Sequence, residues 1–317
     1  MNLLSSLRYL VALDEHRHFA RAAQACHITQ PALSNALRAL EEEFAVVIVR
    51  RGRAFVGFTP EGDKVLDSAR RMLHEHKVLA QSLRSTVDQP AGRFVVGAVP
   101  TAVPIAARFA AMLHARHPEL MPVVLSLSSS ELEKRLESLS IDLALGYTER
   151  MDLRAVQLTA YPQYNEHYFL LRKSRTPHAF ELQIAAPESW LQASEVSLCL
   201  LTPEMHNRTI VDASFAAAGC TPKVVMETNS FLTMALSVVA GQVCSILPGA
   251  LVDAVRGHDG LEALPLTGPV LTTAIGFMSH RQVQPTRALD AALALSQDRE
   301  WLQHAAAHSG LLAAEPL

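Results

Sequence analysis

The sequence predicts an α/β protein in three parts: a small helical domain with a β-hairpin, one long helix, and a larger region of two α/β lobes. Three observations support this prediction. Two short helical segments and an arginine-rich turn lie within the first 58 residues, and a three-to-four spacing of apolar residues then continues to about residue 87. Beyond it, short apolar runs alternate with amphipathic runs, which is typical of an open, largely parallel sheet.

The second helix of the small domain has a well-defined start. Thr29 can accept a hydrogen bond from the first free backbone N–H groups, and Pro31 lies in the first turn, where its missing N–H costs little. Ser34, Asn35 and Arg38 lie away from the apolar stripe, so polar side chains should face outward. The stripe, at spacings of four, three and four, consists of Leu33, Leu37, Leu40 and Phe44.

A shorter helix precedes this one, and its Ala22 and Ala23 are small enough to let two helices cross closely. After the second helix we predict a strand at residues 46–49, a basic turn at 50–53 and a return strand at 55–58. This order is typical of a winged helix-turn-helix, whose second helix enters the major groove and whose basic hairpin suits phosphate or minor-groove contact. The alternative is a helical subdomain with a solvated basic loop. The expected DNA-binding residues are Gln30, Pro31, Ser34, Asn35, Arg38, Arg50, Arg51 and Arg53.

A third helix should start at Thr59, as the cap, with Pro60 in its first turn. About 28 residues at 1.5 Å each give a rod of about 42 Å. A small winged domain alone cannot bury the apolar stripe of such a rod, so we expect the same helix of another subunit to pack on it. Packing on the C-terminal region of the same chain is the alternative. The stripe consists of Val65, Leu66, Ala69, Met72, Leu73, Ala80, Leu83 and Val87.

Several motifs in this part resemble the N-terminal domain of LysR-type transcriptional regulators. They are Ala22-Ala23, the run from Thr29 through Gln30, Pro31, Ala32 and Leu33 to Ser34, Leu40-Glu41-Glu42-Glu43, Arg50-Arg51-Gly52-Arg53 and Thr59-Pro60-Glu61-Gly62, in the family's order and at family-like spacing. The chain departs from the family at Ala45, where glycine is usual, and at Ile48-Val49, where Leu-Phe is usual. The resemblance implies binding to double-stranded promoter DNA as a homo-oligomer, a dimer or tetramer, with RNA polymerase as a further partner.

The region after residue 90 contains two successive blocks of strands and helices. We expect the last strand and the helix after it to return to the first lobe, because the second block offers them no obvious partner. Strands are expected at residues 94–99, 123–127, 142–146, 167–171, 196–201, 223–226, 243–247 and 271–277. Helices are expected at residues 105–116, 130–139, 209–218, 231–240 and 286–296.

This region is similar to the effector-binding domain of the same family, which is itself like a periplasmic-binding protein. Ser129 with Leu136 and Ile141-Asp142-Leu143-Ala144 matches the first lobe, and Val239-Ala240-Gly241 with Leu247-Pro248 matches the second. The resemblance covers nearly the whole chain. We therefore assign a winged helix-turn-helix DNA-binding domain to residues 1–58, a linker (dimerisation) helix to 59–89, and an effector-binding domain to 90–317. Its lobe I would comprise about 91–161 and 268–300, and lobe II about 162–267.

Ligands of such sheets lie outside the carboxyl ends of the strands. The turns there are rich in hydroxyl and amide groups and open onto helix N-termini, which favour anions. We therefore expect a small-molecule effector with a carboxylate, although serine and threonine at these points are also common helix caps. By analogy to family positions, the expected effector-binding residues are Thr101, Ser129, Thr202, His206, Asn207 and Asn229.

Composition agrees with a regulator. The 317 residues have room for two or three compact units. The formal net charge of −3 argues against a protein that coats nucleic acid non-specifically, and residues 1–90 carry an excess of two positive charges. The chain has no GxSxG, GxGxxG, HExxH or P-loop motif, so we expect no catalytic residues, no cofactor and no enzyme activity.

The four cysteines form neither a CxxC pair nor a Cys/His cluster, which indicates no disulfide framework and no metal site. Thiol redox sensing is the alternative function, because Cys199 and Cys220 fall in one lobe. In the family's thiol sensors, however, the reactive cysteine lies in the turn after this strand, where this chain has Met205-His206. The cysteine usage and the lack of a signal-peptide pattern at residues 2–13 favour the cytoplasm.

The uncharged run at residues 230–252 is long enough to cross a bilayer. Gly241-Gln242 and Pro248-Gly249 interrupt it, so a buried helix, a tight turn and a buried strand explain it better. We expect no contact with a membrane.

Overall fold

A computed structural model describes residues 2–52, 55–84, 89–150, 158–174, 182–241, 243–281, 285–310 and 312. The chain divides into two compact units, the first mainly Met1–Asp88 and the second formed by Gln89–Gln282 with Ala288–Leu317. No helix among the described residues is both long and apolar enough to cross a membrane.

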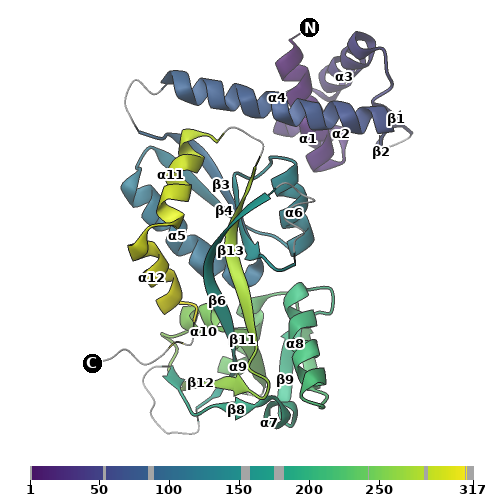
Figure 1. Ribbon diagram of the computed structural model, residues 1–317. Coiled ribbons are helices and arrows are strands. Elements are labelled where there is room, and N and C mark those ends of the chain that lie inside the picture. The colour runs from purple at the N-terminus through teal and green to yellow at the C-terminus, as the bar shows by residue number, and fades with distance from the viewer. Residues whose placement is uncertain are drawn as a thin grey trace. The chain divides into compact units, whose positions relative to one another are not determined.

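The first unit is a three-helix domain with a β-hairpin and one long helix (Figure 1). Its core includes leucines of the first and third helices, and Leu33, Leu37 and Leu40 are fully buried, as the predicted stripe requires. Alanines of the second helix and apolar residues of the hairpin and the long helix complete this core. Phe44 was expected on that stripe but is 40% exposed at the end of its helix. The elements are α1 (Leu3–His16), α2 (Phe19–Ala25), α3 (Gln30–Phe44), β1 (Val49–Arg51), β2 (Phe55–Phe58) and α4 (Pro60–Arg84).

The start of α3 is as predicted: Thr29 is its N-cap, and the Thr29 hydroxyl accepts a hydrogen bond from the N–H of Ala32 at 3.3 Å. The hairpin differs from the prediction. The N–H groups of Ile48 and Val49 donate to the Glu41 carboxylate at 3.0 and 3.1 Å, so the chain before residue 49 is tied to α3. The strand expected at residues 46–49 therefore begins only at Val49, and Arg50 and Arg51 belong to β1 instead of the turn.

Helix α4 begins as expected, because the Thr59 hydroxyl accepts a hydrogen bond from the N–H of Gly62 at 2.9 Å. The first half of its apolar stripe packs on the core of the first unit through Val65, Leu66, Ala69 and Leu73. Two other members of the stripe, Met72 and Leu83, are 47% and 72% exposed, and Leu79 between them is 56% exposed. The stripe thus divides into a part buried within the chain and a part that faces outward.

The second unit is an α/β structure of two lobes joined by long strands (Figure 1). In the first lobe β3 (Gly92–Ala98) pairs in parallel with β4 (Leu120–Ser126) and β5 (Leu143–Tyr147). In the second lobe β9 (Ser197–Leu201) pairs in parallel with β10 (Lys223–Thr228) and β11 (Cys244–Pro248). The parallel strands of the two lobes agree with the predicted open, largely parallel sheet, and both sets belong to one 11-stranded sheet.

Strand β6 (Leu158–Lys173) passes from one lobe into the other. It pairs antiparallel with β13 (Thr272–His280) at one end and with β11 and β12 (Leu261–Thr267) at the other. The sequence pattern indicated only residues 167–171 of β6 and missed β12. The short strands β7 (Gln183–Ile184) and β8 (Glu188–Ser189) lie beside β12.

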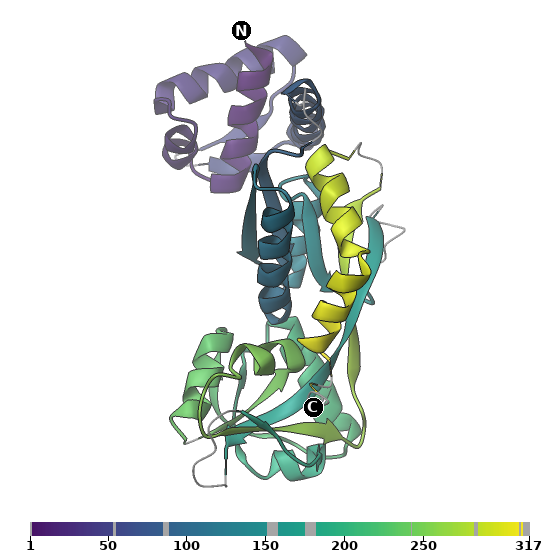
Figure 2. The ribbon, with the colours of Figure 1, turned by 90° about the vertical axis from the view of Figure 1, so that its left-hand side faces the viewer.

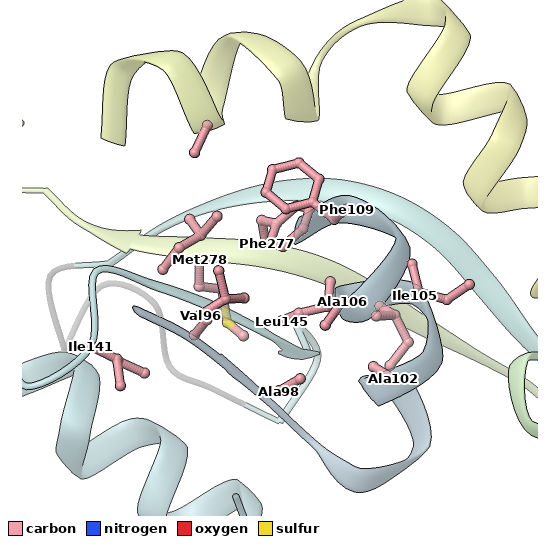
Figure 3. Packing of buried hydrophobic residues seen from close by; sticks show 14 of the residues in the cluster. Val96, Ala98, Ala102, Ile105, Ala106, Phe109, Ile141, Leu145, Phe277 and Met278 are labelled. Atoms are coloured by element: carbon pink, nitrogen blue, oxygen red, sulfur yellow. The ribbon is translucent and has the colours of Figure 1, made fainter. Parts of the chain in front are cut away.

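The C-terminal elements return to the first lobe, as predicted. Strand β13 pairs with β5, and the aromatic rings of Phe109 and Phe277 lie 4.4 Å apart in the core shown in Figure 3. Helix α11 (Arg287–Ser296) contributes Ala288 and Ala292 to the same core. Helix α12 (Arg299–Ala307), which the sequence pattern did not indicate, follows α11 in the yellow C-terminal part of the ribbon (Figure 2). An ion pair of Arg116, at the end of α5 (Val103–Arg116), with Asp298 at 2.7 Å links α5 to the start of α12. The remaining helices are η1 (Pro100–Ala102), α5 (Val103–Arg116), α6 (Ser129–Glu137), α7 (Trp190–Ser194), α8 (His206–Ala217), α9 (Phe231–Val239) and α10 (Gly249–Ala254).

Candidate DNA-binding helix and effector cavity

The outer face of α3 carries the polar side chains that the sequence pattern assigned to it. Gln30, Pro31, Asn35 and Arg38 are exposed, and Ser34 is half-buried. The Arg38 guanidinium donates a hydrogen bond to the Asn35 amide oxygen at 3.5 Å. Arginine and asparagine are the side chains that make bidentate hydrogen bonds to guanine and adenine edges. The face therefore has the chemistry that base recognition needs.

The hairpin adds an exposed cation beside this face of the first unit. Arg50 is exposed on β1, where its charge suits a phosphate. Arg51 lies on the same strand, but its side chain is outside the described residues, as is the whole of Arg53.

A cavity of about 110 Å³ lies between the two lobes of the second unit. The first lobe contributes η1, the start of α6 and the end of β5, and the second lobe contributes the starts of α8 and α9. Because both lobes line it, a ligand here would contact them at the same time. The lining residues are Val99, Pro100, Thr101, Ser128, Ser129, Ser130, Tyr147, Arg150, Glu204, Met205, His206, Asn207 and Phe231.

Two helix N-termini open onto this interlobe cavity. At α6 the Ser128 and Glu131 side chains form a capping box, and among the described residues the N–H groups of Ser129 and Ser130 have no acceptor. At α8 the N-cap, Met205, offers no side-chain acceptor, so the N–H of His206 is not capped either. Uncapped amides and the helix dipole favour an anion at both places.

The ionisable side chains of the lining include one cation, Arg150, one carboxylate, Glu204, and one histidine, His206. Arg150 lines the cavity and pairs with Glu133 at 3.1 Å. Burial lowers the pKa of His206, and the charge of Arg150 lowers it further, so the His206 imidazole is neutral at pH 7. Its ring meets the ring of Tyr147 edge to face, with centroids 4.9 Å apart. Arg150 therefore supplies the positive charge of the lining.

Buried hydroxyl groups connect the lobes beneath the cavity. The Thr101 and Tyr147 hydroxyls, both of the first lobe, lie 3.0 Å apart. The amide of Asn207, from the second lobe, donates to the Tyr147 hydroxyl at 3.5 Å and to the Tyr168 hydroxyl at 3.2 Å. Burial raises the pKa of Tyr147, so this phenol keeps its proton. These hydrogen bonds join α8 of the second lobe to β5 of the first lobe.

A carboxyl group ends this network. Glu166 on β6 is fully buried, and its Oε2 accepts a hydrogen bond from the Tyr168 hydroxyl at 3.4 Å. Its other oxygen has no partner, and neither has the hydroxyl of Tyr164 nearby on the same strand. Burial raises the pKa of Glu166 to about 8, against the hydrogen bonds from Thr101 and Tyr168 that lower it. Glu166 is therefore protonated at pH 7.

The structure brings four of the six predicted effector-binding residues together at the cavity: Thr101, Ser129, His206 and Asn207. Thr202 and Asn229 do not line it. The Thr202 hydroxyl donates to Glu204 at 2.7 Å, and Asn229 is exposed after β10. Sequence reasoning missed Tyr147 and Arg150, although Tyr147 ends β5 at the carboxyl edge where ligands are expected.

The cysteines lie apart from this lining. Cys199 is fully buried on β9, and burial raises the pKa of its thiol. Cys220 is half-buried, and its sulfur contacts the carbonyl oxygens of Trp190 and Phe215 at 3.6 and 3.5 Å. Among the described residues no group of three His, Cys, Asp or Glu side chains could hold a metal ion.

Fold and site together define a DNA-binding regulator with an attached ligand-binding domain. The family model of the LysR substrate binding domain matches residues 88–301, and that of bacterial regulatory helix-turn-helix proteins of the lysR family matches residues 4–63. The chain belongs to the LysR family of DNA-binding transcriptional regulators, whose members are not enzymes.

Individual relatives agree with this assignment. The chain is 29% identical over 287 residues to the DNA-binding transcriptional dual regulator OxyR of Escherichia coli, which covers 90% of this chain and 91% of the relative. It is also 29% identical over 285 residues to the hydrogen peroxide-inducible genes activator of Pectobacterium carotovorum, and this match covers 90% of this chain and 92% of that protein.

Solved structures show the same fold. A full-length OxyR variant from Pseudomonas aeruginosa superposes with a TM-score of 0.67 at 24% identity, over 92% of this chain and 96% of the other. Full-length CbnR in complex with its target DNA superposes with a TM-score of 0.62 at 19% identity, over 95% of this chain and 99% of the other.

Proposed function

We propose that this regulator responds to a small carboxylate that binds in the interlobe cavity. The observation that carries the proposal is the convergence of the N-termini of α6 and α8, one from each lobe, with Arg150 on one cavity. An anion there accepts hydrogen bonds from both lobes and stabilises the arrangement that brings them together. Thr101, Ser129 and Asn207 add polar groups that orient it.

DNA binding in this proposal uses the outward face of α3 for bases and the hairpin for phosphates. Asn35 and Arg38 are the base-reading residues, supported by Gln30, Pro31 and Ser34 at the start of the helix. Arg50, Arg51 and Arg53 bind the backbone. The target is double-stranded promoter DNA in the bacterial cytoplasm, and RNA polymerase is the partner through which the effector changes transcription.

The regulator acts as a homo-oligomer, at least a dimer and by family resemblance a tetramer. The exposed residues Met72, Leu79 and Leu83 of α4 support this, because they recur at spacings of seven and four and so lie along one side of the helix. A second α4 packed against them would remove this apolar surface from water.

A thiol-based peroxide response is the second candidate, favoured by the names of the curated relatives. The burial of Cys199 and its raised pKa argue against it, because the thiolate is the reactive form. Mass spectrometry of the thiols after mild peroxide decides between the two. Loss of free thiol at Cys199 together with a changed DNA affinity would replace the carboxylate proposal.

The carboxylate proposal is tested by a thermal-shift screen of small acids on wild type and on Thr101→Val/Ser129→Ala. Each lost charge-assisted hydrogen bond is worth roughly 1.5–3 kcal/mol, so the double variant should bind the acid at least about tenfold more weakly per bond. Ser194→Ala, whose hydroxyl donates to the carbonyl oxygen of Leu191 and lies outside the cavity, is the matched control and should behave as wild type. DNA binding without acid should survive in all three proteins. An acid that stabilises wild type and the double variant equally binds elsewhere.

A further inference from the structure

A second and larger cavity lies against the first. Its volume is about 450 Å³, and it is formed by one side of α8 and the first residues of β13 and the segment before it. Most of the surface of its lining is apolar, although Glu149, Ser214, Thr272 and Thr273 also line it. The apolar residues that line this side cavity are Ile210, Ala213, Ala217, Pro269 and Leu271.

The two cavities share three residues: Tyr147, Arg150 and His206. The edge-to-face rings of Tyr147 and His206 therefore form the wall between them. Tyr147 is held by hydrogen bonds to Thr101 and Asn207, whereas the described part of the chain offers the His206 imidazole a ring contact with Tyr147 and no hydrogen bond. Rotation of the His206 side chain therefore breaks fewer described hydrogen bonds than rotation of Tyr147 would.

Size decides what the interlobe cavity can hold. An apolar cavity of about 150 Å³ can enclose one benzene molecule. The interlobe cavity, at about 110 Å³, is smaller than that. It accommodates a small carboxylate, and a larger ligand has to extend out of it; the side cavity beyond Tyr147 and His206 is the neighbouring space with an apolar lining.

We infer that the effector is an acid with an apolar body: its carboxylate binds between the N-termini of α6 and α8, and its hydrocarbon part occupies the side cavity along α8. This rests on the proposed function and adds the ligand class to it. Arg150, which lines both cavities, is placed to pair with the acid, and neutral His206 packs on the hydrocarbon next to it. Such a ligand contacts α8 on its N-terminus and on its side.

A chain-length series tests the inference: acetate, butyrate, hexanoate and phenylacetate, titrated against the full chain by thermal shift. Each buried methylene contributes roughly 0.8 kcal/mol, which is about a fourfold gain in affinity. Wild type should therefore bind hexanoate and phenylacetate much more tightly than acetate. Affinity that does not increase from acetate to hexanoate overturns the inference.

Two leucine substitutions on α8 locate the hydrocarbon. Ala213→Leu places three further carbon atoms in the side cavity, so it should reduce the gain with chain length and leave acetate binding unchanged. Ala216→Leu is the matched control, because Ala216 is also exposed on the same helix but does not line the cavity. A gain that is undiminished in Ala213→Leu, or that is reduced equally in both variants, refutes the placement.

Failure of the proposed function gives a different result. If hexanol binds as tightly as hexanoate, and Thr101→Val/Ser129→Ala has no effect on either, the side cavity binds an apolar ligand without the acid site, and both proposals are wrong. If acetate binds and depends on Thr101 and Ser129 while longer acids bind no better, only the ligand class is wrong.

Discussion

Glu166 gives a quantitative test of the buried network between the lobes. Its carboxyl group is fully buried, and one of its oxygens has no hydrogen-bond partner. Ionising it in the folded protein would place an unpaired charge in the interior, which is why burial raises its pKa to about 8 from the ordinary value of 4.5. Glu166→Gln keeps the shape and the acceptor for Tyr168 and removes the titration.

The sign follows from proton linkage. Between pH 4.5 and about 8 the unfolded chain has lost the Glu166 proton, whereas the folded protein keeps it. Below pH 4.5 both states keep the proton, and the contribution of Glu166 to the free energy of unfolding is at its maximum. From pH 4.5 to about pH 8 this free energy of unfolding decreases by about 1.4 kcal/mol per pH unit. Glu166→Gln should equal wild type at pH 4.5 and be more stable by about 3 kcal/mol at pH 7.

Urea unfolding followed by tryptophan fluorescence measures this difference in the second unit alone, because both tryptophans, Trp190 and Trp301, lie there. The exposed Glu119→Gln variant is the matched control. A difference between wild type and Glu166→Gln that stays constant from pH 5 to 8 would show that Glu166 is ionised and paired in the folded protein, and the reasoning would be refuted.

Three further predictions concern the first unit. Arg38→Ala should reduce discrimination between operator and random duplex, whereas Arg50→Ala should weaken binding to both and lower the salt slope by about one; equal losses on the two duplexes for both variants would contradict these roles. Leu79→Asp/Leu83→Asp should dissociate the oligomer in sedimentation, because an unpaired charge in a helix seam costs several kcal/mol; an unchanged assembly of folded protein would exclude this seam. Ala45→Gly should slow hydrogen exchange of α3 by a factor that corresponds to about 1 kcal/mol, because Ala45 has φ = +52° and glycine adopts that conformation without a Cβ clash; unchanged or faster exchange would mean that the strain is relieved elsewhere.

Local patterns were sufficient for the DNA-binding half. The period of Leu33, Leu37 and Leu40 and the cap at Thr29 depend on neighbours within one or two turns, so the sequence alone placed α3 and its outward face. The same holds for the start of α4. The wing was misplaced because Glu41, on another element, takes the N–H groups that a longer β1 would have used.

Only the tertiary structure decided the composition of the candidate site. Strand alternation identified the sheets, but the carboxyl ends of strands from both lobes meet only through the register of β6 and β13, which pairs distant segments. That pairing brings Tyr147 within hydrogen-bond distance of Asn207, 60 residues away, and leaves Thr202 outside. The sequence determined which side chains could bind an anion, and long-range packing determined which of them share one cavity.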